Sequence, residues 1–168
     1  MPEATAKQPP APKTDFLLRP MCLIDLDRIL ELEHAAFSDP WSRDSFRWEI
    51  ENNKYALCYV AVINDLVVGY AVCWLLADEF HIANLAVAAE YRRRGIGAWL
   101  LGNLLDQARR QQAVVAHLEV RRSNLEAIRL YRRFGFRVVG VRPNYYPTTG
   151  EDALLMSSIL QTSDRQSP

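Results

Sequence analysis

The chain has 168 residues, of which 49% are hydrophobic, and this size and composition predict a single globular domain with a substantial core. Twenty basic and twenty acidic residues cancel, so bulk binding to nucleic acid or to an anionic membrane is not expected and any anion site must be local. No apolar run approaches the roughly 20 residues that cross a bilayer, which argues against a membrane-spanning segment.

The two ends of the chain differ in composition from the middle. Residues 1–14 are rich in Pro, Ala and Lys, and residues 161–168 are polar, so both are expected to be disordered tails around a domain at 15–160. The first segment lacks the apolar stretch of a signal peptide. Cys22, Cys58 and Cys73 fit neither a zinc site nor a CxxC redox pair, and they predict reduced core thiols in a reducing, cytoplasmic compartment.

The first half of the chain predicts a strand, two helices and three further strands. Residues 15–21 form a short apolar run that ends near Pro20, and apolar residues at helical spacing over 24–37 predict an amphipathic helix. Pro40 breaks that helix, and Ser42 is expected to cap a short second helix over 43–52. Apolar runs at 55–63, 66–77 and 80–90 predict strands, the first two joined by a hairpin turn at Asn64-Asp65.

The second half predicts two helices and three strands. Ser123 or Asn124 is expected to cap a helix over 125–133 that Gly135 ends, and strands are expected at 113–120, 136–146 and 151–160. The first of the two helices precedes these elements and follows Gly97. Its broad apolar face is made of Trp99, Leu100, Leu101, Leu104, Leu105 and Ala108. The order β-α-α-β-β-β-α-β-α-β-β predicts the α/β (α+β) class, with a mixed, mostly antiparallel sheet flanked by about four helices.

The segment EYRRRGIG, from Glu90 to Gly97, places three arginines and two glycines at the start of the leucine-rich helix. Leu100 stands where a dinucleotide fingerprint needs a third small residue, and the Gly-Lys-Ser/Thr of a Walker A loop is missing. Free N–H groups and the dipole at a helix start favour an anion, and glycines let an oxygen approach the amides. The pattern predicts a phosphate cradle, with a glycine-rich helix entry and solvated arginines as the alternative.

Several segments together resemble the GNAT superfamily of GCN5-related N-acetyltransferases. YRRRGIG matches the acetyl-CoA motif R/Q-x-x-G-x-G/A, LEVRRSNLEAIRLYRRFGF resembles the next strand–helix unit, and NYYP with EDALLM resembles the last hairpin. Together with FSDPW near the start, these segments resemble in particular the RimI-type protein N-terminal acetyltransferases. The resemblance covers roughly residues 15–160.

By position, this resemblance implies how acetyl-CoA is held. A strand edge pairs with the pantetheine arm, the helix start binds the pyrophosphate, and no metal is expected. The arginines at 109–110 and 132–133 are expected on solvated helix faces, with one or two reaching the 3′-phosphate. The implied cofactor-binding residues are Leu85, Ala86, Val87, Arg92, Arg93, Arg94, Gly95, Ile96, Gly97, Ala98, Asn124 and Tyr131.

The resemblance also implies that Glu119 is the general base and Tyr131 the general acid. A carboxylate can take, directly or through water, the proton that an ammonium must lose before it attacks a thioester. From the residues alone, Glu119 also fits a solvent-facing strand position and Tyr131 a core aromatic. His81 and His117 are the other candidate bases, with an ordinary polar or packing role favoured for both.

The acceptor implied by the resemblance is a protein N-terminal α-amine, in RimI-type enzymes the N-terminal alanine of small-subunit ribosomal protein eighteen. Tyr145 and Tyr146 in the last hairpin are expected to wall a narrow peptide slot as substrate-binding residues. The loop PTTGED is a residue or two shorter than in related enzymes, which leaves the substrate preference open. The alternatives are acetylation of a lysine or a small-molecule amine, and a non-catalytic acyl-CoA-binding module.

Overall fold

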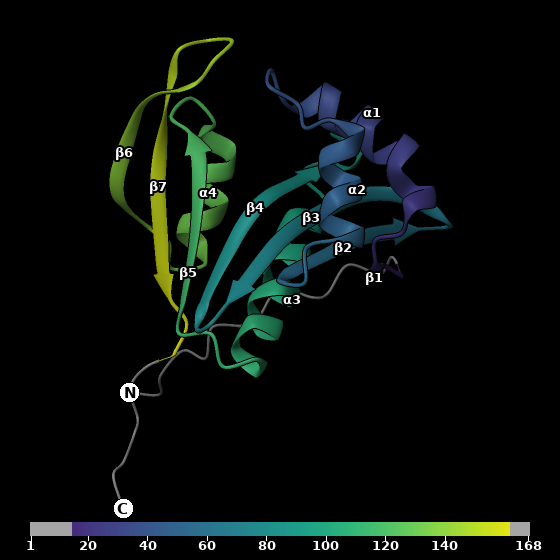
Figure 1. Ribbon diagram of the computed structural model, residues 1–168, viewed down its shortest axis with the longest axis horizontal. Helices are drawn as coiled ribbons and strands as arrows, with labels where there is room; N and C mark the ends of the chain where they lie inside the picture. The colour runs from purple at the N-terminus through teal and green to yellow at the C-terminus, as the bar shows by residue number, and fades with distance from the viewer. Residues whose placement is uncertain (1–14, 162–168) are drawn as a thin grey trace, which may run out of the picture.

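A seven-stranded sheet organises residues 15–161, the part of the chain that the computed structural model describes (Figure 1). The tails expected at 1–14 and 161–168 lie, Gln161 apart, outside the described residues. The order of elements agrees with the prediction. The strands are β1 (Leu17–Pro20), β2 (Ala56–Ile63), β3 (Leu66–Leu76), β4 (Glu79–Val87), β5 (Val115–Arg121), β6 (Arg137–Tyr146) and β7 (Glu151–Ile159). The helices are α1 (Leu26–Ala36), α2 (Arg43–Glu51), α3 (Ile96–Arg110) and α4 (Leu125–Arg133), with short 3₁₀ turns η1 (Leu23–Asp25) and η2 (Ala89–Tyr91).

The strands are ordered β1-β2-β3-β4-β5-β7-β6, and every neighbouring pair is antiparallel except β4 with β5. The mixed, mostly antiparallel sheet is therefore confirmed. Asn64 and Asp65, between β2 and β3, have φ angles of +48° and +64°. Two successive positive φ angles are what a type I′ turn requires, so the predicted hairpin is confirmed as well.

The parallel pair of β4 and β5 is short and forks toward the carboxyl ends of its strands. Paired residues run only from Glu79 with Val115 to Ile82 with Leu118. Beyond that point β4 continues beside β3, and β5 continues beside β7. Figure 1 shows β4 and β5 diverging above their paired ends. Because each strand stays paired on its other side, the sheet splits without unravelling.

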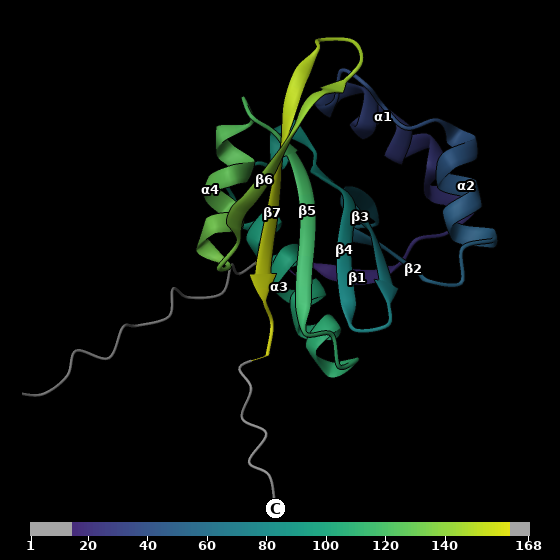
Figure 2. The same ribbon diagram turned by 60° about the vertical axis from the view of Figure 1, so that its left-hand side comes forward.

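Helices cover both faces of the sheet, with α1 and α2 on one side and α3 and α4 on the other (Figures 1 and 2). The alternation along β3 shows the two cores: Tyr70 and Val72 pack in the α1–α2 cluster, Ala71 and Cys73 in the α3–α4 cluster. The predicted apolar face of α3 is buried at Leu100, Leu101, Leu104, Leu105 and Ala108, while Trp99 is partly buried.

Local capping chemistry sets two of the helix starts. The Ser42 hydroxyl accepts a hydrogen bond from Ser45 N at 3.1 Å, and Asn124 Oδ1 accepts one from Ala127 N at 3.2 Å. Asn124, rather than Ser123, is thus the cap of α4. Each cap satisfies a backbone N–H that has no partner inside its helix, so both helices begin where the sequence predicted.

The cysteines only partly meet the expectation of three core thiols. Cys73 is buried and Cys58 half-buried, but Cys22 is exposed, and all three are free. Cys22 lies in the surface turn between β1 and η1, so the core placement is wrong for that residue. Among the helices of the described part, none is both long and apolar enough to cross a membrane.

Candidate functional site

A cavity of about 810 Å³ opens where β4 and β5 diverge. Its lining comes from the ends of β4 and β5, the start of α3, one face of α4, Tyr146 and the segment after α1. It therefore joins segments that are far apart in the sequence. The predicted site residues in its lining are Leu85, Ala86, Val87, Arg92, Arg93, Gly95, Ile96, Gly97, Ala98, Glu119, Asn124, Tyr131 and Tyr146. Two predicted residues, Arg94 and Tyr145, are not part of the lining.

One wall of the cavity is the edge of β4 that β5 leaves uncovered. Residues Leu85 to Val87 pair with β3, but they lie beyond Ile82, the last residue of β4 with a partner on β5. Backbone N–H and C=O groups on such an edge are available to an extended ligand, apart from the Val87 carbonyl, which accepts a hydrogen bond from Arg92. The pantetheine arm of coenzyme A carries amide groups, so this edge has the chemistry that the sequence prediction requires.

The start of α3 faces the same cavity. Gly95 is the N-cap residue with φ +80°, and the backbone N–H of Trp99 donates to its carbonyl at 2.9 Å. The N–H groups of Ile96, Gly97 and Ala98 therefore precede the first intrahelical bond and need another acceptor. With the positive end of the helix dipole beside them, they form a site suited to a phosphate oxygen.

The two glycines of the motif have different structural reasons. A Cβ at Gly95 would meet nothing within 4 Å, so the requirement there is the left-handed backbone, which side chains disfavour. A Cβ at Gly97 would come within 3.4 Å of Leu130 Cδ2 and 3.9 Å of Val87 Cγ2. Both separations are ordinary van der Waals contacts, so packing does not require glycine at this position, and the approach of an oxygen to the amides stays the predicted reason for it.

The three motif arginines are not equivalent. Arg92 Nε donates to the Val87 carbonyl at 3.1 Å, and Arg92 and Arg93 both line the cavity. The guanidinium of Arg94 instead lies 5.1 Å from the ring centroid of Tyr91, outside the lining, and its part in binding the coenzyme stays a prediction. Arg129 and Arg133 of α4 do line the cavity. Arg133 belongs to the arginines expected near the 3′-phosphate, whereas Arg129 was missed, although its i, i+4 spacing from Arg133 puts both on one helix face and could have identified it.

Glu119 lies on β5 next to the fork, with its side chain 19% exposed. Its Oε2 is 2.6 Å from His81 Nε2, and its Oε1 is 3.8 Å from a guanidinium nitrogen of Arg142. The hydrogen bond with His81 lowers the pKa of Glu119 below its ordinary value, against the opposing effect of burial. The carboxylate is therefore ionised at neutral pH and lines the cavity, which rules out the solvent-facing alternative.

The two histidines differ in their relation to Glu119. The ring of His81 contacts the Glu119 carboxylate directly, so His81 lies beside the predicted base, and its role as a base or an ordinary polar residue stays a prediction. His117 lies opposite His81 in the parallel register, but its Nδ1 is 2.7 Å from the Ser157 hydroxyl and its Nε2 is 3.8 Å from Glu79. His117 is thus the ordinary polar residue that the sequence favoured. The contact of His81 with Glu119 could have been predicted only if the register of β4 on β5 had been known.

Tyr131 lines the cavity from α4 while packing against Phe136, with ring centroids 5.8 Å apart. Burial raises the pKa of its hydroxyl well above the ordinary value, so the group keeps its proton at neutral pH. Among residues 15–161, no hydrogen-bond partner binds that hydroxyl. Tyr131 thus packs as a core aromatic, one of the two alternatives from the sequence. It also lies beside the cavity, where the other alternative, the general acid, would have to be.

Arg121 ties the last hairpin to the segment that follows α1. Its guanidinium lies 3.8 Å from the ring centroid of Tyr146, 2.9 Å from the Thr149 hydroxyl and 3.5 Å from Glu151. It also binds Asp39, between α1 and α2, at 2.5 Å. The side chain of Arg121 is only 13% exposed. These contacts hold two opposite walls of the cavity together, and we call them the Arg121 clamp.

The clamp separates the roles of the two predicted tyrosines. Tyr146 lies under Arg121 and lines the cavity, and burial raises its pKa to about 12. Tyr145 is 43% exposed and packs edge-on against Tyr146, so it supports the wall without forming it. The sequence analysis missed Arg121 and Asp39. Residues two apart on a strand share a face, and the spacing from Glu119 to Arg121 could have identified the arginine.

Within residues 15–161, no group of three or more His, Cys, Asp or Glu side chains is arranged to hold a metal ion. The cavity brings together the hydrogen-bonded Glu119 and His81, the amides at the start of α3 and the edge of β4 that β5 leaves uncovered.

Comparison with known proteins identifies relatives for most of the chain. The sequence profile of the Acetyltransferase (GNAT) family matches residues 25–136. The chain is 36% identical over 135 residues to the ribosomal protein bS18-alanine N-acetyltransferase of Escherichia coli K12, covering 79% of this chain and 90% of that protein. It is 38% identical over 144 residues to a Bacillus subtilis protein provisionally assigned the same activity, covering 86% and 95%.

Solved structures agree with the sequence relatives. The crystal structure of the Escherichia coli ribosomal-protein-S18-alanine N-acetyltransferase matches with a TM-score of 0.83 at 30% identity, covering 92% of this chain and 99% of that one. Arabidopsis thaliana Naa50, in complex with the bisubstrate analogue CoA-Ac-MVNAL, matches with a TM-score of 0.74 at 27% identity, covering 85% and 97%. The predicted fold is thereby confirmed.

Proposed function

Because the chain belongs to the acetyltransferase (GNAT) family and is an acetyl-CoA-dependent N-acetyltransferase, we propose that its acceptor is the α-amine at a protein N-terminus. The acceptor residue we propose is the N-terminal alanine of ribosomal protein bS18, which the names of the relatives specify for those proteins. The observation that carries the proposal is the Glu119–His81 pair, placed at the fork of β4 and β5 beside the helix start of α3.

The cavity suits acetyl-CoA on its own geometry. The free edge of β4 offers backbone groups to the pantetheine amides, and the amides of residues 96–98 offer hydrogen bonds to the pyrophosphate. Arg129 and Arg133 supply positive charge on the α4 side for further phosphate. A nucleotide held in this way would extend its thioester along β4 toward Glu119.

In the proposed reaction, the acceptor ammonium first loses a proton to the Glu119–His81 pair, directly or through water. The free amine then forms a bond to the thioester carbon, and the carbon–sulfur bond breaks as the electron pair leaves on sulfur. The nitrogen gives up its second proton to solvent or to the thiolate, which leaves the neutral amide. Tyr131 keeps its proton at neutral pH, so it can donate that proton or a hydrogen bond to the departing thiolate. A thiolate is a good leaving group, so the base contributes more than the acid.

An α-amine is the favoured acceptor on grounds of acidity. Its ordinary pKa is about 7.7–8.0, against about 10.4 for a lysine side chain, so a larger share is already neutral at pH 7. A lysine would need roughly 2.4–2.7 units of further help, about 3 to 4 kcal/mol at 1.36 kcal/mol per unit. The cavity wall of Tyr146, fixed by the Arg121 clamp, also favours a chain end with a small first side chain.

The test compares two forms of one peptide that begins with alanine and contains an internal lysine. One form has a free terminus and the other a terminus blocked by acetylation. We expect mass spectrometry to find transfer to the free terminus and little transfer to the lysine of the blocked form. Equal or greater labelling of the lysine would replace the N-terminal acceptor with a lysine or another amine.

A further inference from the structure

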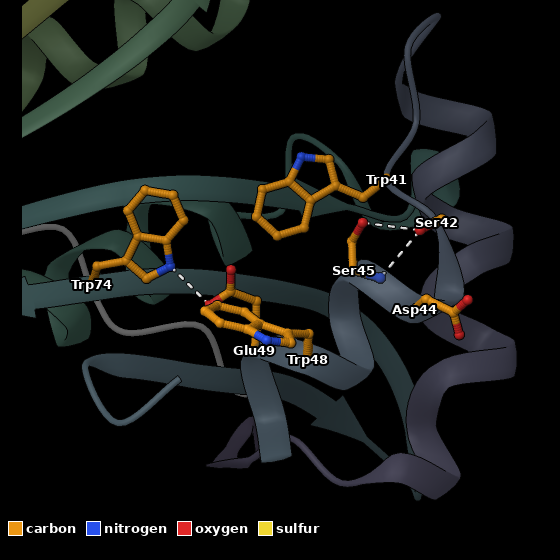
Figure 3. Close-up of a pocket in the computed structure, with 7 residues that line it drawn as sticks. All are labelled: Trp41, Ser42, Asp44, Ser45, Trp48, Glu49 and Trp74. Atoms are coloured by element: carbon orange, nitrogen blue, oxygen red, sulfur yellow. Dashed lines mark hydrogen bonds between the residues drawn. The ribbon is translucent and has the colours of Figure 1, made fainter. Parts of the chain in front are cut away.

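A second cavity, of about 540 Å³, lies on the α1–α2 side of the sheet (Figure 3). Its walls are mostly aromatic: Trp41 precedes α2, Trp48 lies on α2, and Trp74 lies on β3. Two acidic residues of α2, Asp44 and Glu49, complete the lining with two serines at the start of that helix. The reaction proposed above uses none of these three indoles and neither carboxylate.

Glu49 is the buried polar group of this cavity. The residue is 7% exposed, and its Oε2 accepts hydrogen bonds from Trp74 Nε1 at 2.9 Å and from Asn53 Nδ2 at 2.7 Å. Its Oε1 has no hydrogen-bond partner within the described part of the chain. Figure 3 shows that oxygen pointing into the space between the indoles of Trp74 and Trp41. Because no buried side-chain oxygen of the described residues lacks a partner, this oxygen is open to the cavity, where it can accept a hydrogen bond from a ligand, most strongly from a charged donor.

The indoles are arranged to receive a cation. Trp48 keeps 53% of its surface exposed, which is unusual for the largest apolar side chain, while the bond to Glu49 fixes the ring of Trp74. Indole faces attract cations more strongly than other aromatic rings do, and a nearby carboxylate adds to that attraction. The combination of aromatic walls with a half-satisfied carboxylate matches a guanidinium, which can stack and donate at once.

In the part of the chain that the structure describes, no positively charged residue lines this cavity. Neither arginine of α2 is part of the lining: Arg43 binds Asp27, and Arg47 lies 3.8 Å from Asp44, the exposed carboxylate at the rim of the cavity. At 100° per residue, both arginines lie on the side of α2 opposite Ser45, which lines the cavity. Within residues 15–161 the lining thus offers acceptors and aromatic faces but no cation of its own, which leaves the cavity open to a cationic ligand.

The position of the cavity indicates which molecule that is. Trp41 lines both this cavity and the one at the fork. Trp74 is the register partner of His81, and their rings meet edge to face with centroids 5.1 Å apart. His81 in turn binds Glu119, where the acceptor amine would lose its proton. An acceptor chain whose first residue lies at Glu119 thus has this cavity within reach of its next few residues, at about 3.3–3.6 Å per residue.

We propose that the cavity of Trp41, Trp48, Trp74 and Glu49 binds the guanidinium of an arginine at position two, three or four of the acceptor chain. This inference rests on the proposed N-terminal acceptor, and it adds a sequence preference to that function. The indoles and the carboxylate select the positive charge, while the amine at Glu119 reacts. Lysine would enter less well, because its compact ammonium cannot stack flat on an indole while it donates to Glu49.

The test uses peptides that begin with a free alanine and differ only at positions two to four. At each position arginine is compared with citrulline, which keeps the shape without the charge, and with norleucine, which is apolar. We expect kcat/KM to be about tenfold higher for arginine than for either replacement at one of these positions. Equal values for all three side chains at every position would overturn the proposal, and a preference for norleucine would show an apolar pocket instead.

Variants then locate the preference. Glu49→Gln keeps the shape of the side chain and Trp48→Ala removes an exposed ring, and each should bring the arginine-to-citrulline ratio to within about twofold of one. Glu51→Gln is the matched control, since it removes the same charge from an exposed position of the same helix, and it should keep the tenfold ratio. A ratio that survives both cavity variants would overturn the assignment to this cavity. Circular dichroism melts check that each variant is folded.

A binding measurement separates this inference from the proposed function. Calorimetric titration of the same arginine and citrulline peptides does not depend on turnover. If no peptide is acetylated but arginine still binds about tenfold more tightly in a Glu49-dependent way, the acceptor proposal fails and the cavity assignment stands. If the peptides are acetylated but bind and react equally, the cavity assignment fails and the acceptor proposal stands.

Discussion

Replacing Glu119 with glutamine is the most direct perturbation of the proposed proton transfer. The change keeps the length and shape of the side chain, and it removes the negative charge that faces His81 at 2.6 Å. An amide oxygen can still accept a hydrogen bond from the ring, so the positions of both side chains should be kept. What is lost is the ability of the pair to accept a proton from the acceptor ammonium.

The expected cost follows from that role. A positioned general base contributes on the order of 10²–10⁴ in rate, which corresponds to about 2.7–5.5 kcal/mol at 1.36 kcal/mol per tenfold. The lower end applies if His81 still accepts the proton alone. The upper end applies if the ring depends on the carboxylate for its orientation and for stabilisation of its charged form. His81→Gln should therefore cost a similar amount, and the double variant little more than either single one.

The pH dependence has a definite sign. The pKa of Glu119 is lowered from the ordinary 4.5 by its bond with His81, so the carboxylate stays ionised throughout the range above pH 5. The fall of wild-type kcat/KM between pH 8 and 6 should then follow the acceptor amine, whose pKa is about 8. For stability, a lowered folded pKa stabilises the protein above the unfolded value of about 4.5, and this stabilisation is lost as the pH falls through the folded value.

The assay measures release of the coenzyme A thiol with a thiol reagent, using the alanine peptide as acceptor and calorimetry for acetyl-CoA affinity. The matched controls are Glu79→Gln and His117→Gln. These two residues form a similar pair 3.8 Å apart on the same two strands, outside the cavity lining. We expect the control variants to keep full turnover and all variants to keep their affinity for acetyl-CoA. A Glu119→Gln enzyme within about threefold of wild type would refute the assignment of the base.

Three further predictions concern the clamp, the cradle and acid stability. Arg121→Ala should raise the KM for the peptide about tenfold without changing acetyl-CoA affinity. The control Arg122→Ala, at an exposed neighbouring position, should change neither quantity. Equal effects of the two variants would show that the Arg121 clamp does not shape the peptide slot. Gly95→Ala and Gly150→Ala both place a side chain at a positive φ angle, +80° at Gly95 and +68° at Gly150, so each should cost about 1 kcal/mol of stability. Calorimetry should find weaker acetyl-CoA binding only for Gly95→Ala. The hydrogen bonds from Arg19 lower the pKa of Asp25 below its ordinary 3.8. Asp25→Asn should therefore lose about 2 kcal/mol of unfolding free energy at pH 7. Urea denaturation should find that this difference between wild type and variant shrinks as the pH falls below 3.8.

The sequence by itself determined the features that depend on neighbours along the chain. The caps at Ser42 and Asn124, the hairpin turn at Asn64-Asp65 and the apolar face of α3 all lie where short-range chemistry predicts them. The anion-binding helix start was also evident, because free amides and glycine are local properties. The family resemblance added Glu119 and Tyr131, whose roles stay predictions.

The tertiary structure decided which distant side chains meet. His81 and Glu119 are 38 residues apart, and Arg121 and Asp39 are 82 apart. The sequence contains no signal for such pairs until the register of β4 on β5 is known, because a shift of one residue would turn each strand side chain to the other face. The fork that exposes the edge of β4 has the same origin, since it depends on where pairing between two strands stops.

Packing between helices decided the rest. Gly97 lies against Leu130, and Arg94 lies over Tyr91 although its sequence neighbours line the cavity. The aromatic cavity gathers Trp41 from the connection before α2, Trp48 from α2 and Trp74 from β3 around one buried carboxylate. A sequence specifies these contacts only through the whole fold, because their energies depend on distance and burial rather than on position along the chain.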